Sequence, residues 1–157
     1  MNQAGNVLQF TIWYQITEKG KVMEDRYLFK AKRIDNGEWV EGLYTYCDRK
    51  YYIRLITDET SRYKKSFFEV DPTTICQCTG LKDKNGKLIW ENDIVKDEKG
   101  NFYKAFWQNN YYQFSWICVK ADVLPIGSKW DLWSFKSFEI EVIGNGFDNP
   151  ELLEREE

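Results

Sequence analysis

The residues of this chain best suited to chemistry are carboxylates that follow one short apolar segment. Glu91 and Asp93 stand two positions apart, and Asp97 and Glu98 come within the next five residues. Paired carboxylates can bind Mg²⁺ or act as general acid and base, provided that they converge in a dry cleft. Here they alternate with apolar residues at an expected strand corner, where a solvated rim or a capped turn is the usual arrangement. We therefore predict no metal site, no cofactor and no catalytic residue among them.

Other catalytic arrangements are also missing from the sequence. Histidine is absent from all 157 residues, which removes the commonest general base and metal ligand. A Ser-His or Cys-His pair therefore cannot form within the chain. The sequence has neither a phosphate-binding glycine loop nor a nucleophile elbow. We expect that the protein is not an enzyme.

The four cysteines, Cys47, Cys76, Cys78 and Cys118, are the remaining reactive groups. Cys76 and Cys78 are expected to place both sulfur atoms on one face of a strand. A zinc site that also uses Cys47 and Cys118 is conceivable, but the paired Cys-x-x-Cys spacing of zinc sites is missing. Reduced thiols on the strands of a cytoplasmic protein are the simplest interpretation.

Aromatic residues make up 17% of the chain, with 7 Trp, 10 Tyr and 10 Phe. Such residues favour pleated, half-buried surfaces, so the composition predicts a mainly β protein with aromatic cores and cross-strand pairs. A stacking platform for bases or sugars is the alternative. The net charge of −3 weighs against it, because proteins that bind phosphates usually carry a basic excess. No window approaches the roughly 18 apolar residues of a membrane-spanning helix, so we expect no membrane association.

Alternation of apolar and polar residues predicts a series of short strands joined by tight turns. Strands are expected near residues 27–32, 39–46, 51–56, 64–70, 75–78, 88–90, 94–96, 102–107, 111–119 and 138–142. Turns are expected at Asn36-Gly37 and Asn85-Gly86, because this dipeptide adopts positive φ at low cost. Pro72 lacks the backbone donor that a central strand needs, and it marks the expected boundary between two units.

These elements predict a small N-terminal β meander over residues 23–72 and a small barrel over residues 73–157. Closure into a barrel is favoured because it removes exposed strand edges. A short C-terminal helix is expected, with Asn149 as its N-cap and Pro150 at its first position. We interpret residues 1–22 either as a non-native extension before a translation start at Met23, or as an extra edge strand.

Three blocks of the sequence carry a family resemblance. They are Arg26-Tyr27-Leu28-Phe29-Lys30 with Asp35-Asn36-Gly37-Glu38-Trp39-Val40-Glu41-Gly42, then Thr79-Gly80-Leu81-Lys82-Asp83-Lys84-Asn85-Gly86-Lys87 through Glu91-Asn92-Asp93-Ile94-Val95, and finally Glu141-Val142-Ile143-Gly144-Asn145 through Asn149-Pro150-Glu151-Leu152-Leu153. In this order they resemble the YopX family of phage and prophage proteins, which also starts near Met23. Asn92 stands where that family commonly has Gly, and Asn tolerates the left-handed region better than most residues.

The resemblance implies a C-terminal barrel of SH3-like type, a phage or prophage gene and a cytoplasmic protein of a bacterial host. It implies no established biochemical activity. Within and next to the matching blocks we assign structural roles to Gly80, Asn85, Gly86, Glu91, Asp93, Gly144, Asn149 and Pro150.

The leading functional prediction is a non-enzymatic module that binds another protein or assembles with itself. Its basis is the aromatic excess, since two small β units would leave some of these side chains exposed as a patch. The alternative is a single-stranded nucleic-acid-binding module, and a pocket for a small nucleotide or a host signal molecule is a third hypothesis. The candidate binding face combines aromatic rings with lysines, namely Tyr103, Trp107, Tyr111, Tyr112, Lys82, Lys84, Lys87 and Lys104.

Overall fold

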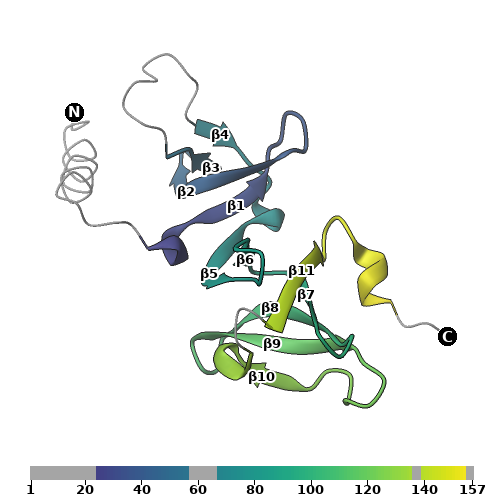
Figure 1. Ribbon diagram of the computed structural model, residues 1–157. Helices are drawn as coiled ribbons and strands as arrows, with labels where there is room; N and C mark the ends of the chain where they lie inside the picture. The colour runs from purple at the N-terminus through teal and green to yellow at the C-terminus, as the bar shows by residue number, and fades with distance from the viewer. Residues whose placement is uncertain (1–23, 57–66, 136–138, 155–157) are drawn as a thin grey trace, which may run out of the picture.

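A computed structural model describes residues 24–56, 67–135 and 139–154, and it shows a mainly β protein with two antiparallel sheets (Figure 1). The first sheet has the strand order β4-β3-β2-β1-β5-β6, and the second has the order β10-β9-β8-β7-β11. Short 3-10 turns are the only helices in the described part of the chain. The prediction of a mainly β fold is confirmed, whereas residues 1–22 lie outside the described residues.

The first four strands form the expected meander. They are β1 (Phe29–Lys32), β2 (Trp39–Cys47), β3 (Lys50–Arg54) and β4 (Phe67–Glu69), and each pairs with the next. Gly37 has φ 74° in the first turn, as the Asn-Gly pair predicts. Asp48 and Arg49 have φ 51° and 61° in the second turn, which is the backbone of a tight two-residue hairpin.

Strand β2 changes partner at Gly42, a feature that alternation does not predict. Its first four residues pair with β1, and its last five pair with β3. A Cβ atom on Gly42 would lie 2.0 Å from the Arg54 carbonyl oxygen. Glycine therefore lets the two backbones approach closely where the sheet bends.

Two strands that follow Pro72 also belong to the first sheet. They are β5 (Cys76–Lys82) and β6 (Leu88–Trp90), and β5 pairs with β1 through Phe29 and Gln77. A 3-10 turn, η2 (Pro72–Thr74), connects β4 to β5, with the Asp71 carboxylate accepting a bond from Thr73 N. Backbone pairing therefore continues across the expected boundary, and the division into residues 23–72 and 73–157 stays a prediction.

The second sheet is open, so the expectation of a closed barrel is wrong. Its strands are β7 (Asp93–Asp97), β8 (Phe102–Gln108), β9 (Gln113–Lys120), β10 (Lys129–Asp131) and β11 (Ile140–Asn145). Strands β10 and β11 are the two edges and do not pair with each other. At the β11 edge, the loop after β5 takes the place of a closing strand, because Lys84 N donates to Ile140 O and Val142 N donates to Asp83 Oδ2.

The C-terminal helix is shorter than expected. Pro150 does occupy its first position, but η5 (Pro150–Leu153) is a single 3-10 turn. The Asn149 side chain does not cap this turn, because its Oδ1 atom accepts a bond from Asn145 N at 3.3 Å. Asn149 therefore fastens the turn to the end of β11 rather than extending a helix. Two further 3-10 turns are η1 (Asp25–Tyr27) and η3 (Leu132–Ser134).

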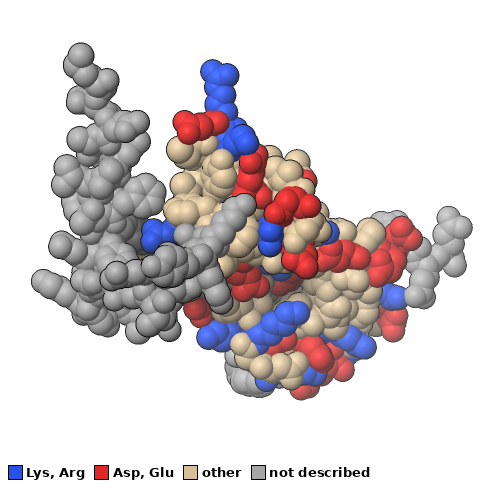
Figure 2. Space-filling model, turned by 90° about the horizontal axis from the view of Figure 1, so that it is seen from above, with Lys and Arg blue, Asp and Glu red and all other residues tan. Residues whose placement is uncertain are grey.

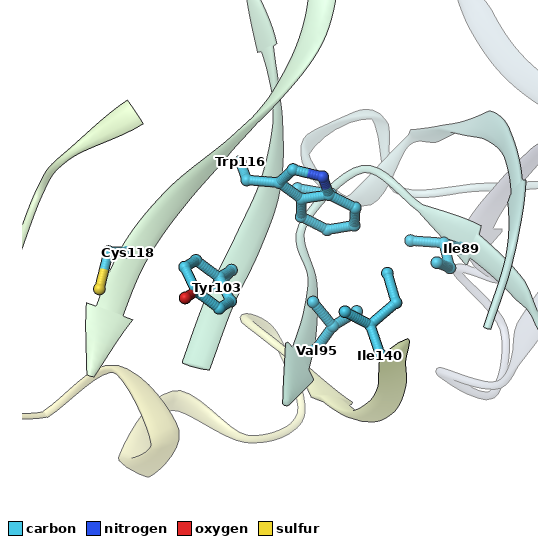
Figure 3. Packing of buried hydrophobic residues seen from close by; sticks show 7 residues of the cluster. Ile89, Val95, Tyr103, Trp116, Cys118 and Ile140 are labelled. Atoms are coloured by element: carbon cyan, nitrogen blue, oxygen red, sulfur yellow. The ribbon is translucent and has the colours of Figure 1, made fainter. Parts of the chain in front are cut away.

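The largest hydrophobic core lies on one face of the second sheet. It contains Ile89, Val95, Tyr103, Ala105, Trp116, Cys118 and Ile140. Figure 3 shows the Trp116 and Tyr103 rings on β9 and β8 directed into the same interior as Val95 and Ile140. We call this the inner face of the second sheet and the opposite side its outer face. None of the helices in the described part of the chain has the length and apolar character needed to cross a membrane.

Candidate binding surfaces

The predicted binding face does not form one surface, and Tyr103 does not belong to any surface. The Tyr103 ring is 1% exposed and packs against Phe135 with ring centroids 4.6 Å apart. Its hydroxyl donates to Asp97 Oδ2 at 3.1 Å, and burial raises the pKa of this phenol. Alternation along β8 explains the placement, because Tyr103 and Ala105 point to the inner face. Tyr103 is therefore a core residue, and its assignment to a binding face is wrong.

Three of the four lysines of the predicted face lie away from its exposed aromatic residues. Lys82 Nζ is 3.2 Å from Asp25 Oδ2, and Lys84 Nζ is 2.6 Å from Glu141 Oε2. Lys84 N also donates to Ile140 O, and Ile140 pairs with Asp97 at the end of β7. The loop of residues 83–87 therefore lies near the β7–β8 turn. The exposed aromatics flank the β8–β9 turn, at the opposite end of β8. Lys82, Lys84 and Lys87 therefore do not line the same surface as Trp107, Tyr111 and Tyr112.

The exposed aromatics of the predicted face lie at the same end of the second sheet as Trp130 and Trp133, which were not predicted to belong to it. Trp107 packs edge-on against Phe114, its partner across the β8–β9 hairpin, with ring centroids 5.0 Å apart. The adjoining turn is joined to β10 by a bond of 2.8 Å from Gln113 Nε2 to Asp131 Oδ1. We call the resulting surface the aromatic end; its exposed members are Trp107 (39%), Tyr111 (68%), Tyr112 (83%), Trp130 (37%) and Trp133 (76%).

Tyr112 has a strained backbone in the middle of this surface. Its φ is 52°, a left-handed conformation that is uncommon for a bulky side chain. Expected as a strand residue, Tyr112 lies instead in the turn, because β9 begins at Gln113. The turn consequently presents Tyr111 and Tyr112 to solvent side by side.

The outer face of the second sheet carries a second surface, which we call the lysine face. Lys104, Ile117 and Lys129 are cross-strand neighbours on β8, β9 and β10. Lys96 Nζ and Lys120 Nζ lie 5.8 and 5.6 Å from the Phe102 ring centroid, and Lys129 Nζ lies 5.4 Å from that of Phe106. Only Lys104 was predicted to belong to a binding face. The alternation Phe102-Lys104-Phe106 in β8 is the sequence signal that could have revealed this face.

Acidic and basic side chains are interspersed over the surface shown in Figure 2, where no broad area of one sign is seen among the coloured residues. This mixture agrees with the net charge of −3. A continuous track for a phosphate backbone would require a basic excess on one face. The view in Figure 2 therefore gives no support to such a track.

Three of the four carboxylates considered for chemistry, Glu91, Asp93 and Asp97, have a structural partner. Asp97 Oδ1 accepts from the backbone of Lys99 and Asn101, which closes the β7–β8 turn. Glu91 is half-buried at the strand corner, and burial raises its pKa despite hydrogen bonds from the backbone of Trp107 and Gln77. No group of three or more His, Cys, Asp or Glu residues suited to a metal occurs within the described ranges.

Asp83 is a buried carboxylate that sequence analysis left without a role. Its Oδ1 atom accepts from Asn85 N at 2.8 Å and Lys87 N at 2.9 Å, and its Oδ2 atom accepts from Val142 N at 3.0 Å. Burial alone would raise the pKa of this carboxyl, but the three backbone donors hold it below its ordinary value. Asp83 therefore closes the Asn85-Gly86 turn and attaches it to the edge of β11.

The glycines of the structural motif occupy positions that favour glycine. Gly80 and Gly86 have φ 81° and 80°, and Gly80 lies where the β5–β6 register shifts. A Cβ on Gly144 would lie 2.5 Å from Asn149 Oδ1, so glycine lets the 3-10 turn pack against β11. Asn92 has φ 65°, as expected for a residue that replaces Gly at the strand corner.

The two sheets are joined by a cluster that we call the junction. Lys30 Nζ on β1 lies 2.7 Å from Asp93 Oδ1 on β7, and both side chains are nearly inaccessible to solvent. Asp93 Oδ2 also accepts from Trp90 N at 2.9 Å. Trp39 Nε1 donates to Asp148 Oδ2 at 2.6 Å. The junction uses residues from each of the three sequence blocks that carry the resemblance.

The cysteines are separated by burial. Cys76, Cys78 and Cys118 are buried, and Cys47 is exposed. Cys76 and Cys78 share the buried face of β5, as predicted. Burial raises the pKa of the Cys76 thiol to about 11, which disfavours a metal-binding thiolate.

Comparison with known proteins identifies one family. The family model described as YopX protein matches residues 28–154. This range includes all three blocks except the first residues of the first one, and it spans the junction, the aromatic end and the lysine face. No curated protein matches the chain.

Proposed function

The chain belongs to the YopX family, and from this premise we propose that it is a phage- or prophage-encoded, non-enzymatic protein that binds other protein chains, copies of itself included. Its place of action in this proposal is the cytoplasm of a bacterial host. The second sheet, with five short strands and tight turns, supports an SH3-like relationship in an open form. The chemistry of the side chains supports a binding role, since three of the four candidate acids, Glu91, Asp93 and Asp97, have structural partners.

The aromatic end is the observation that carries the proposal. Trp107, Tyr111, Tyr112, Trp130 and Trp133 are exposed by 37 to 83%. Large aromatic side chains that gather on a surface typically mark a protein interface, where they provide rigid contact area with a polar group at the tip. The Gln113–Asp131 bond joins β10 to the residue that directly follows the turn, which restrains the backbone at this end of the sheet before binding.

The test removes three aromatic side chains that the structure leaves most exposed. The variant combines Tyr111→Ser, Tyr112→Ser and Trp133→Ser. A matched control, Val123→Ser with Ile126→Ser, removes exposed apolar side chains from the loop at the other end of β9. We expect the native chain and the control to associate, with themselves or with a captured protein, and the triple variant to associate at least about tenfold more weakly.

Sedimentation velocity over a range of concentrations measures self-association. Affinity capture from host cells that carry the gene, followed by mass spectrometry, measures binding to other proteins. Equal association of the triple variant and the native chain would overturn the role of the aromatic end. A native chain that is monomeric at all concentrations and captures no protein would overturn the proposed function.

A second candidate function, binding of single-stranded nucleic acid, is favoured by the lysine face. Lys96, Lys104, Lys120 and Lys129 lie around Phe102 and Phe106, which supplies positive charge and rings together. Three of these ammonium groups already lie over the two rings, which leaves less ring surface for stacking. Fluorescence anisotropy with labelled single-stranded DNA and RNA at low salt tests this candidate.

For this second candidate, the informative variant is Lys96→Glu with Lys104→Glu, and the control is Lys99→Glu in the β7–β8 turn. Binding that weakens with salt and is lost only in the double variant would support a nucleic-acid interface. Absence of binding at low salt would remove this candidate.

A further inference from the structure

The edge strand β10 offers a row of outward backbone groups. Cys118 N donates to Ser128 O at 2.9 Å, and Cys118 O accepts from Gly127 N, so the Ser128 carbonyl group points toward β9. Backbone N–H and C=O groups point to alternate sides along a strand. Those of Trp130, which lies opposite Trp116, therefore also point toward β9. The N–H and C=O groups of Lys129 and Asp131 therefore point away from β9, toward the outer edge.

No described strand pairs with this outer edge of β10. All three residues of β10 are exposed, and in Figure 1 the strand lies on the side of the second sheet away from the first sheet. At the other edge of the same sheet, β11 is bonded to the loop that follows β5. An edge left open in this way is a template for a further strand.

The order of charges in β10 identifies the strand that fits. Lys129 and Asp131 flank Trp130, so the short strand has one positive and one negative side chain on its outer face and one ring on its inner face. When such a strand meets a second copy of itself in antiparallel order about Trp130, Lys129 of each copy faces Asp131 of the other. Opposite charges placed across neighbouring strands are stabilising, and like charges are destabilising.

We propose that two copies of this chain pair through β10 about a two-fold axis at Trp130. Lys129 of each copy and Asp131 of the other form the hydrogen-bonded pairs, using the backbone groups that point outward. The two Trp130 residues form the close, non-hydrogen-bonded pair between them. The two second sheets become one continuous sheet, and the interface is the same patch on both copies.

The neighbouring contacts already hold both charged side chains in place. Asp131 Oδ1 accepts from Gln113 Nε2 at 2.8 Å, and Lys129 Nζ lies over the Phe106 ring. Trp130 Nε1 donates to Ser128 Oγ at 3.2 Å. Because these bonds order the edge before association, pairing costs little side-chain entropy. The strand has only three residues, so the interface is small and the dimer is expected to dissociate on dilution.

This inference rests on the proposed protein-binding function and names its partner, so the test reverses charges at the edge. Lys129→Asp places a second carboxylate opposite Asp131 of the other copy, and Asp131→Lys places a second ammonium group opposite Lys129. We expect each variant alone to associate at least about tenfold more weakly than the native chain, because both cross-strand pairs then repel. When the two variants are mixed, each copy of one variant carries two carboxylates and faces two ammonium groups of the other. Every pair is then attractive again, and native mass spectrometry should show heterodimers.

Two controls keep the test specific. Glu98→Lys and Lys99→Glu each reverse one exposed charge in the β7–β8 turn, and both should associate as the native chain does. The double variant Lys129→Asp with Asp131→Lys carries the reversed pair in one chain and should recover association. Circular dichroism confirms that each variant is folded.

The position of the axis is tested by cross-linking. In a Cys47→Ser background, Trp130→Cys should form a disulfide between copies on mild oxidation, because close cross-strand pairs have Cα separations of about 4.5 Å. Lys129→Cys should not, since it faces Asp131 of the second copy. Equal cross-linking of the two variants would overturn the proposed register.

The outcomes separate this inference from the proposed function. If the charge variants and their mixture associate as the native chain does, while the aromatic triple variant loses association, the β10 pairing is overturned and the proposed function stands. If the native chain is monomeric but captures another protein, the β10 pairing is again overturned. If the native chain neither self-associates nor captures a protein, both are overturned.

Discussion

Lys30 and Asp93 form a buried ion pair between two sheets, with Lys30 Nζ 2.7 Å from Asp93 Oδ1 across 63 positions of sequence. The ammonium group also lies 5.0 Å from the Trp39 ring centroid and 5.5 Å from that of Trp90. These rings shield the pair from water and provide a further attraction for the positive charge. Lys30 thus connects β1 of the first sheet to the corner at which the second sheet begins.

We predict that Lys30→Met destabilises the protein by about 3 to 5 kcal/mol, because it leaves the Asp93 carboxylate buried without its counter-ion. The double variant Lys30→Met with Asp93→Leu should be more stable than Lys30→Met alone, since it removes both charges. Urea unfolding at neutral pH measures both. A Lys30→Met variant as stable as the native chain would contradict the role of the pair.

The same variant has a predicted pH dependence. Burial raises the pKa of Asp93, and Lys30 acts against this rise. A carboxyl whose pKa is raised in the folded state does not lower the free energy of unfolding below its unfolded-state pKa of about 3.9. It lowers the free energy of unfolding as pH rises from there through the folded-state pKa. Without Lys30 the folded pKa rises further. The stability lost in Lys30→Met should therefore be smaller at pH 4 than at pH 7.

A second prediction compares a buried carboxylate with an exposed one in neighbouring positions. Asp83→Ala removes the acceptor of three backbone N–H groups and should cost about 2 to 4 kcal/mol. Glu141→Gln removes an exposed ion pair with Lys84 that solvent screens, and it should cost far less than Asp83→Ala. Equal losses in denaturant unfolding would show that the Asp83 bonds are not important for the turn.

Asp148 should make the junction sensitive to acid. Partial burial acts to raise the pKa of this carboxyl, but bonds from Asn145, Lys32 and Trp39 lower it to about 2. A lowered pKa contributes stability above the unfolded value of about 3.9, and that stability is lost as pH falls through the folded value. The difference in stability between the native chain and Asp148→Asn should therefore be full at pH 6 and shrink between about pH 4 and pH 2. A constant difference across this range would contradict the assignment.

The local features of the fold were predictable from sequence because short-range chemistry determines them. Gly37 and Gly86 adopt the positive φ that Asn-Gly turns require, and Asn92 adopts it at the strand corner. The strands are near their expected positions because alternation of apolar and polar residues reports which strand face is buried. The junction and the bonds between the β11 edge and the loop after β5 depend instead on distant partners, which local patterns do not record.

Two residues show why the candidate site was predicted only in part. Lys30 alternates as a solvent-exposed residue would, yet it is buried, because its ammonium group pairs with Asp93 and lies against the Trp39 and Trp90 rings. Tyr103 has the composition of a stacking residue, yet it is a core residue, because the inner face of β8 is covered by Phe135. Trp107, Tyr111 and Tyr112 of the predicted face are exposed, because two of them lie in the β8–β9 turn and Trp107 lies near the end of β8.

Gly42 provides a prediction about the bend in β2. Gly42→Ala would place a Cβ atom 2.0 Å from the Arg54 carbonyl oxygen, so the two backbones must separate. We expect a loss of stability of about 1 to 3 kcal/mol or more, as in overpacked cores. Glu41→Ala, at the exposed neighbouring position, is the matched control and should change little. A Gly42→Ala variant that unfolds at the same urea concentration as Glu41→Ala would show that the bend does not need glycine.

The last prediction concerns the thiols. Cys47 is exposed, and Asp48 and partial desolvation raise its pKa; Cys76, Cys78 and Cys118 are buried, and burial raises theirs. Since all four pKa values are raised, access rather than thiolate content should decide the rates. We expect one thiol to react quickly with Ellman's reagent at pH 8 in the folded protein, and four in denaturant. Cys47→Ser should abolish the fast phase; a fast phase that survives this substitution would show that a buried thiol is accessible through opening of the sheets.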